Sequence, residues 1–188
     1  MPSEKMNKFK IKDISFMALA LALMYVFGKV LYILSRFFPI PGSRVIFTTP
    51  LFTFILTAAV LKTKKIGTIS LIMGLLGLIL LRLTIFGALA VSITGFLTDL
   101  TSLILIRRYT DYKSIYRTLA FHSFYSIRAS YFIVKLFIEN SSFITGSFYL
   151  VLLVSVILYF LAFYISKASI RLFKSRKLLD SNTYSFKE

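Results

Sequence analysis

The first apolar stretch of the chain decides its fold class: residues 14–34 read ISFMALALALMYVFGKVLYIL. Lys29 is the one charged side chain in this stretch. An α-helix needs about 20 mostly apolar residues to cross the hydrocarbon core of a bilayer. The stretch is too long for the apolar core of a signal peptide, and a proline-rich segment follows it in place of a small-residue cleavage site. We therefore predict that it is the first membrane-spanning helix.

Five further apolar stretches follow, separated by short polar segments. The six predicted spans cover residues 14–34, 45–61, 66–81, 83–106, 115–138 and 143–166. The third is the shortest, and residues 178–188 form a polar tail. No second domain or internal repeat interrupts the pattern. Residues 1–188 are therefore predicted to form a single transmembrane domain, as a multi-pass protein of the cell membrane.

The composition also indicates an all-α integral membrane protein. Hydrophobic residues make up 57% of the chain and charged residues 16%, whereas soluble domains carry roughly 25% charged residues. The formal net charge of +16 would suggest a nucleic-acid partner in a soluble protein. Here the cations lie in short clusters between apolar stretches. This pattern predicts that the chain lies in a lipid bilayer and binds no nucleic acid. The chain has no cysteine, which excludes disulfides and thiolate metal sites.

The basic clusters predict the orientation of the spans, because Lys and Arg concentrate in cytoplasmic loops. They occur before the first span and after the second, fourth and sixth spans. Their members are Lys5, Lys8, Lys10 and Lys12; Lys62, Lys64 and Lys65; Arg107, Arg108, Lys113 and Arg117; and Lys167, Arg171, Lys174, Arg176 and Lys177. Six spans place all four clusters on one side. We therefore predict six transmembrane helices with both termini in the cytoplasm (N-in/C-in).

The sequence offers few groups for catalysis. It has one histidine, His122, and seven acidic residues, and it lacks a His-Glu-x-x-His, a Gly-x-Ser-x-Gly and a phosphate-binding loop. We therefore predict no catalytic residues, no metal site and no cofactor. Asp99 in the fourth span and His122 in the fifth fall at similar depths. Because ionisable groups inside a membrane are costly, we expect an interhelical hydrogen bond between them or, alternatively, a proton or cation site.

Cationic and aromatic residues in the outer half of the spans are candidates for ligand binding. Arg128 lies near the middle of the fifth span, where a guanidinium should face the bundle interior and pair with Asp99 or with an anionic ligand. Tyrosine rings in the fifth and sixth spans could stack on a flat ligand, and they equally suit bundle packing or an interfacial belt. The candidate substrate-binding residues are Arg44, Arg82, Tyr125, Arg128, Tyr131 and Tyr149.

Small residues mark surfaces where helices can approach closely. Ala18 and Ala22 are four residues apart and therefore share one face of the first span. Gly67, Gly74 and Gly77 permit close packing of the third span within the bundle.

The first outer connection is stiff and apolar, because Phe38-Pro39-Ile40-Pro41-Gly42 contains two residues with a fixed φ. It either caps the helix ends or forms a lid over an outward-facing pocket.

Together these features resemble the substrate-binding S-component of an energy-coupling-factor (ECF) vitamin transporter. The resemblance rests on the chain length, the six-helix layout, the Ala18-x-x-x-Ala22 pair, the Phe38-Pro39-Ile40-Pro41 loop and the absence of a catalytic or nucleotide site. It implies high-affinity binding of a vitamin or related micronutrient from outside. It also implies that Ala18 and Ala22 dock on a transmembrane coupling subunit, and that a cytoplasmic ATPase pair drives transport. The pocket is expected at the outer end, between the fourth, fifth and sixth helices.

Three other functions stay open. A stand-alone permease or channel needs polar residues along its whole path, and the cytoplasmic half of this chain has few. A membrane enzyme would have few titratable groups to use. A non-catalytic membrane scaffold is compatible with the sequence and would bind no small molecule.

Overall fold

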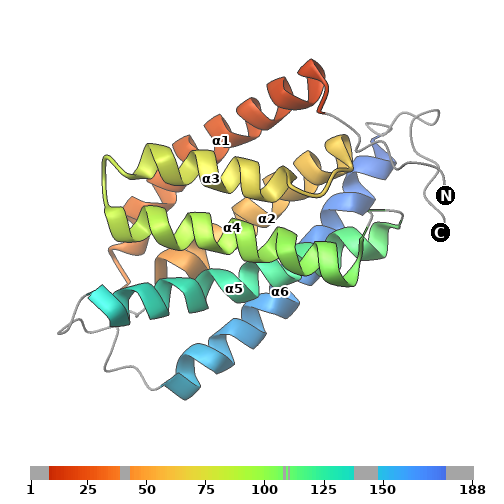
Figure 1. Ribbon diagram of the computed structural model, residues 1–188. Helices are drawn as coiled ribbons and strands as arrows, with labels where there is room; N and C mark the ends of the chain where they lie inside the picture. Colours follow the sequence, from red (N-terminus) through yellow and green to blue (C-terminus); the bar gives the residue numbers. More distant parts are fainter. Residues whose placement is uncertain (1–8, 39–42, 108, 110, 138–147, 177–188) are drawn as a thin grey trace.

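The computed structural model describes residues 9–38, 43–107, 109, 111–137 and 148–176. Within these ranges the chain forms six α-helices and no strand (Figure 1). They are α1 (Ile11–Ser35), α2 (Ser43–Thr63), α3 (Thr68–Leu80), α4 (Ile85–Leu105), α5 (Tyr112–Phe137) and α6 (Phe148–Ser175). The predicted all-helical fold is confirmed, and each helix overlaps one predicted span.

The last helix differs most from its predicted bounds. α6 continues to Ser175, past the predicted end at residue 166, and the predicted start at residue 143 lies outside the described residues. The extension carries Lys167, Arg171 and Lys174. Lys and Arg are good helix formers and are favourable near a helix C-terminus, where the helix dipole is negative. The charged residues after residue 166 therefore end the apolar stretch, but the helix continues through them.

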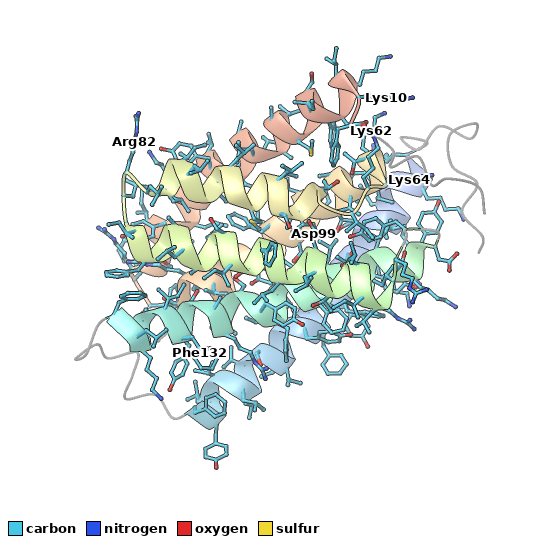
Figure 2. All side chains as sticks on the ribbon, in the orientation of Figure 1. Lys10, Lys62, Lys64, Arg82, Asp99 and Phe132 are labelled. Carbon is cyan, nitrogen blue, oxygen red and sulfur yellow. The ribbon has the colours of Figure 1, made fainter. Side chains whose placement is uncertain are left out.

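Successive helices run in alternating directions, so the bundle has two distinct ends (Figure 1). The Lys62 end holds the start of α1, the end of α6 and the α2–α3 and α4–α5 connections. The Arg82 end holds the end of α1, the start of α2 and the α3–α4 turn. Lys10, Lys62 and Lys64 lie on the opposite side of the bundle from Arg82 (Figure 2).

The central helix is α2, which packs against α1, α3, α5 and α6. Leu56, Ala59 and Val60 of this helix are fully buried in the main apolar core. By contrast, α1 packs only on α2 and α3 among the described helices. The opposite faces of the bundle are therefore built by α1 and α3 on one side and by α5 and α6 on the other.

Four of the helices, α1, α2, α4 and α6, are long and apolar enough to cross a membrane. α3 has 13 residues, about 20 Å of helix, and α5 is long but more polar. Much of the surface is apolar as well: Val26 on α1 and Ile157 on α6, for example, are both more than half exposed. Such extensive apolar exposure is unusual on a soluble monomer and fits a lipid environment.

Glycines allow α3 and α4 to pack closely. A Cβ placed on Gly95 would lie 2.5 Å from the Cβ of Met73, and one on Gly77 would collide with Ser92. The prediction of close packing is therefore confirmed for Gly77. Gly74 instead faces open space, and Gly67 precedes α3 with a φ of 97°, a left-handed conformation that favours glycine.

Candidate functional site

Asp99 is buried, and its carboxylate accepts a hydrogen bond at the start of α3. The backbone N–H of Ser70 donates to Asp99 Oδ2 at 2.6 Å, and the Ser70 hydroxyl donates to the carbonyl of Gly95 at 3.1 Å. The first N–H groups of a helix have no intrahelical acceptor and form the positive end of its dipole. Asp99 on α4 thus supplies a tertiary cap for the short helix α3.

This arrangement corrects the prediction that Asp99 pairs with His122. His122 is buried on α5, and neither ring nitrogen has a hydrogen-bond partner among the described residues. Asp99 does not reach Arg128 either, because the guanidinium of Arg128 stacks on Phe124. The Asp99 carboxylate lies against α3 because the first N–H groups of that helix have no acceptor within the helix and attract it. The spacing of residues in the sequence did not reveal where these N–H groups lie.

Hydroxyl groups inside the bundle mostly bond to one another or to the preceding helical turn. The interhelical pairs are Thr53–Ser123 at 3.4 Å, Thr57–Ser166 at 3.1 Å and Ser102–Thr118 at 3.0 Å, and all six residues are buried. They connect α2 to α5 and α6, and α4 to α5. These paired hydroxyls act as structural contacts between the described helices.

Arg128 lies in an aromatic environment on α5. Its Cζ is 3.8 Å from the centroid of the Phe124 ring, and its side chain is only half-buried. The neighbouring Tyr125 shares a hydrogen bond of 3.0 Å with Thr101 on α4. Within the described part of the chain, no carboxylate forms an ion pair with Arg128. A guanidinium over an aromatic face retains free N–H donors for an anion.

The two other candidate tyrosines have different surroundings. Tyr131 is buried in a second apolar cluster at the Arg82 end, with Ile127, Val151 and Leu158. Tyr149, at the start of α6, is 80% exposed. The structure therefore places Tyr131 one turn from Arg128 within the bundle, whereas Tyr149 lies on its surface.

Arg44 belongs to a cationic group at the junction of α1 and α2. Its Nη2 and that of Arg36 donate to the Tyr32 hydroxyl at 3.1 and 3.0 Å, and both guanidinium groups lie over the Tyr32 ring. Neither Tyr32 nor Arg36 was predicted as a site residue. The spacing of Tyr32 and Arg36, four residues apart on one helix, was the available signal.

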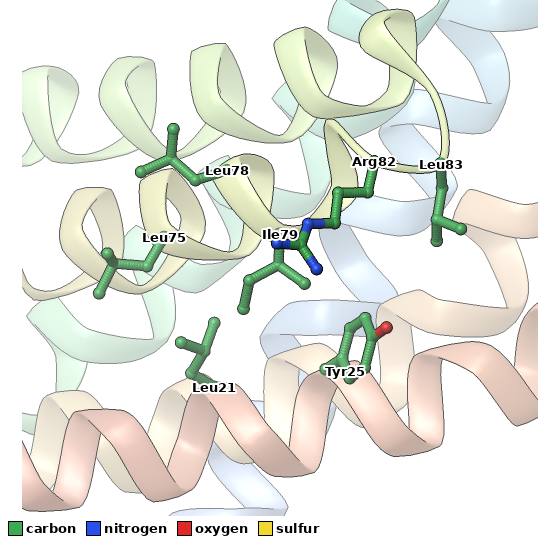
Figure 3. A pocket seen from close by; sticks show the side chains of 7 residues that line it. All are labelled: Leu21, Tyr25, Leu75, Leu78, Ile79, Arg82 and Leu83. Carbon is green, nitrogen blue, oxygen red and sulfur yellow. The ribbon is translucent and has the colours of Figure 1, made fainter.

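Arg82 lies apart from the other candidates, at one end of a groove between α1 and α3 (Figure 3). The groove has a volume of about 500 Å³ and is lined by Leu21, Tyr25, Leu75, Leu78, Ile79, Arg82 and Leu83. The six predicted substrate-binding residues thus fall at several places: the α1–α2 junction, the α1–α3 groove, α5 and the exposed start of α6.

Ala18 and Ala22 are exposed on α1. Met17, Ala20 and Met24 form the buried face of this helix. The pair of small residues is therefore not used for packing within the described bundle, and it lies on a surface that a second helix can reach.

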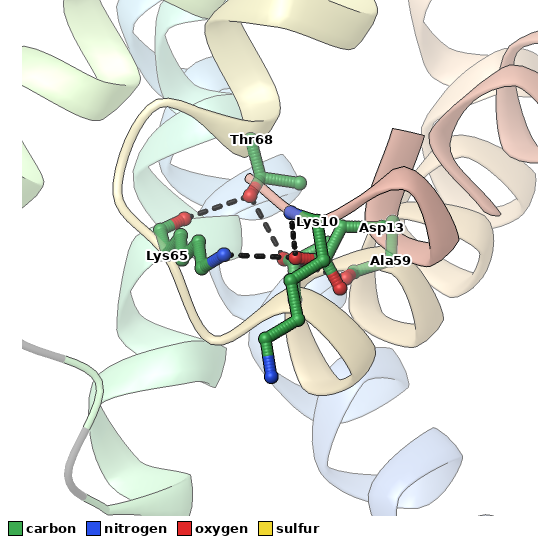
Figure 4. Close-up of polar contacts among 6 residues, drawn as sticks. Lys10, Asp13, Ala59, Lys65 and Thr68 are labelled. Carbon is green, nitrogen blue, oxygen red and sulfur yellow. Dashed lines mark hydrogen bonds and ion pairs between the residues drawn. The ribbon is translucent and has the colours of Figure 1, made fainter. Parts of the chain in front are cut away.

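Contacts at the Lys62 end join the start of α1 to the α2–α3 turn (Figure 4). Lys65 Nζ lies 2.8 Å from Asp13 Oδ2, which also accepts the backbone N–H of Lys10 at 3.0 Å. Tyr109, between α4 and α5, is buried at this end, and its hydroxyl has no hydrogen-bond partner in the described residues. Burial, followed by the negative charge of Asp99, raises the pKa of Tyr109 to about 12.

Comparisons of the chain with protein-family models, curated proteins and solved structures give no match. The described residues also contain no group of three or more His, Cys, Asp or Glu side chains that could hold a metal ion.

Proposed function

We propose that this chain is the substrate-binding subunit of an ECF-type importer for a vitamin or related micronutrient with an anionic group. It crosses the cell membrane six times, with the Lys62 end in the cytoplasm and the Arg82 end outside. The alternating helices and the basic residues at the Lys62 end support this orientation. α3 and α5 cross as part of the bundle, since both pack against the long apolar helices.

Arg128 is the observation that most supports an anionic substrate. It is nine residues from the end of α5 at Phe137, about 14 Å along the helix. A cation at that depth is costly unless it has a counter-charge, and the described residues provide none. A substrate carboxylate or phosphate would supply the counter-charge and accept forked hydrogen bonds from the guanidinium. Tyr125, one turn earlier on the same helix, is half-buried, whereas Tyr131 is buried in the second apolar cluster.

The binding proposal is tested first by mass spectrometry of small molecules released from the detergent-purified protein. We expect one micronutrient in near-stoichiometric amount. Isothermal titration with that compound should then show a loss of about 10-fold or more in affinity for Arg128→Gln, the size expected for a charge-assisted hydrogen bond. Lys135→Gln is the matched control, because it removes an exposed cation from the same helix. Release of lipid alone, or equal affinities of the two variants, would contradict the proposal.

The exposed Ala18 and Ala22 face supports docking on a transmembrane coupling subunit. Replacing both residues by Leu should prevent co-purification with the coupling subunit and the ATPase pair while preserving ligand binding. Val156→Leu, on the exposed face of α6, is the control for added bulk in the membrane. Normal ATP-driven uptake by the double variant would exclude this docking surface. Substrate flux into liposomes without partner subunits would instead favour a stand-alone permease.

A further inference from the structure

The groove between α1 and α3 is apolar along its walls and cationic at one end. Leu21 comes from α1, whereas Leu75, Leu78 and Ile79 come from α3. In Figure 3 the guanidinium of Arg82 reaches back over this groove toward the ring of Tyr25. The combination of an aliphatic trough and a terminal cation matches an amphiphile better than a uniformly polar solute.

A second cation lies at the same end. Lys29 Nζ is 4.6 Å from the centroid of the Tyr25 ring, and Tyr25 lines the groove together with Arg82. Neither cation forms an ion pair with a carboxylate in the described ranges. The described acidic residues are elsewhere: Asp13 pairs with Lys65, Asp99 caps α3, and Asp111 lies between α4 and α5.

The location of the groove separates it from the proposed substrate site. α1 contacts neither α5 nor α6, so the groove lies on the opposite side of the bundle from Arg128. Leu75 and Leu78 are about half exposed, at 47% and 62%, and would face acyl chains in a bilayer. Arg82 is at the end of the helix hairpin, where a long cationic side chain can reach the level of lipid phosphates.

We propose that this groove binds an anionic phospholipid. One acyl chain lies against Leu21, Leu75 and Leu78, and the headgroup phosphate lies between Arg82 and Lys29. This site requires that the chain is embedded in a membrane, but it does not depend on the transport role. The site recognises the phosphate and the acyl chain of its ligand together. A phosphate compound without an acyl chain should therefore bind much more weakly.

Native mass spectrometry of the full-length protein in detergent tests the proposal. The protein is titrated with phosphatidylglycerol and with phosphatidylcholine that carry the same acyl chains. We expect preferential retention of phosphatidylglycerol. The double variant Lys29→Gln/Arg82→Gln should lose about 25-fold in apparent affinity for it, taking about fivefold for each cation near the membrane surface. Arg107→Gln/Lys113→Gln removes the same charge at the Lys62 end and should keep the preference.

Two further measurements distinguish the possible occupants. Leu78→Trp narrows the apolar part of the groove without changing its charge, and it should also weaken phosphatidylglycerol binding. This variant tests the groove even if the double variant fails to fold, which circular dichroism would reveal. Equal retention of the two lipids, equal losses in the two charge variants, or full binding by Leu78→Trp would overturn the proposal. Displacement of the lipid by glycerol phosphate at similar concentration would also overturn it and indicate a site for a soluble anion.

Discussion

Replacing Asp99 by leucine should substantially destabilise the protein. Leucine is of similar size but offers no acceptor, so the Ser70 N–H that now lies 2.6 Å from Asp99 Oδ2 loses its partner inside the bundle. An unsatisfied buried donor costs about 1–3 kcal/mol, and loss of a carboxylate from a helix N-terminus costs about 0.3–2 kcal/mol. We therefore expect Asp99→Leu to lower the free energy of unfolding by about 2–4 kcal/mol. Asp99→Asn retains an acceptor oxygen and removes a buried charge, so it should lose only about 1 kcal/mol or less.

Thermal unfolding in detergent, followed by circular dichroism at about 222 nm, measures this difference; the chain contains no tryptophan for a fluorescence readout. For a chain of this length, 1 kcal/mol corresponds to a shift of about 2–4 °C in the unfolding midpoint, so Asp99→Leu should unfold about 5–15 °C below the native protein. Asp111→Asn controls for loss of an acidic residue, since its carboxylate accepts no hydrogen bond from the described residues and Ser114 donates to its backbone carbonyl. If Asp99→Leu were as stable as Asp99→Asn, the capping role of this carboxylate would be refuted.

Three other predictions use the same unfolding assay. Gly95→Ala should lower the free energy of unfolding by about 1–3 kcal/mol, because the added Cβ overlaps α3. Gly74→Ala should raise it by up to about 1 kcal/mol, because alanine has the higher helix propensity and the added Cβ enters open space. The reverse order of stabilities would contradict the packing described. Tyr109→Phe should reduce the loss of stability between pH 10 and pH 12. In that interval the unfolded tyrosine, with an ordinary pKa near 10, releases its proton, while the native hydroxyl, with a pKa of about 12, retains it; identical pH profiles of the two proteins would exclude this linkage. Breaking the Asp13–Lys65 ion pair by Asp13→Asn should cost about 1 kcal/mol or less, clearly below the effect of Asp99→Leu.

Apolar stretch length predicted the number and order of the helices. A membrane helix depends mainly on about 20 consecutive apolar residues, which is a local property of sequence. The length of the apolar stretch did not reveal where α6 ends, because charged residues such as Lys167 end an apolar stretch but do not break a helix. Four helices are long and apolar enough to cross a membrane. The count of six spans, their N-in/C-in orientation and the location in the cell membrane stay predictions.

The partners of buried polar groups were less predictable. Equal depth in neighbouring spans suggested that Asp99 would meet His122, but depth does not specify the direction in which a side chain points around its helix. The start of α3 at Thr68 places unpaired N–H groups beside Asp99, and these groups depend on where a helix begins. His122 is left with two unpartnered ring nitrogens in the described residues. Spacing also did not reveal the direction of the candidate site residues: Arg82 lines the groove between α1 and α3, whereas Arg128 stacks on Phe124.

The distribution of charge explains why we expect the Arg82 end to bind anions. In the proposed orientation the Lys62 end is cytoplasmic, and the positive-inside bias accounts for its cations; Asp13 partly neutralises them through Lys65. The proposed orientation places Arg36, Arg44 and Arg82 outside, where the positive-inside bias does not account for them. Their guanidinium groups rest on tyrosine rings or over an apolar groove, and no described carboxylate pairs with them. In the two proposals, a lipid phosphate would balance the charge of Arg82 and a substrate anion would balance that of Arg128, at two separate places on the same half of the molecule.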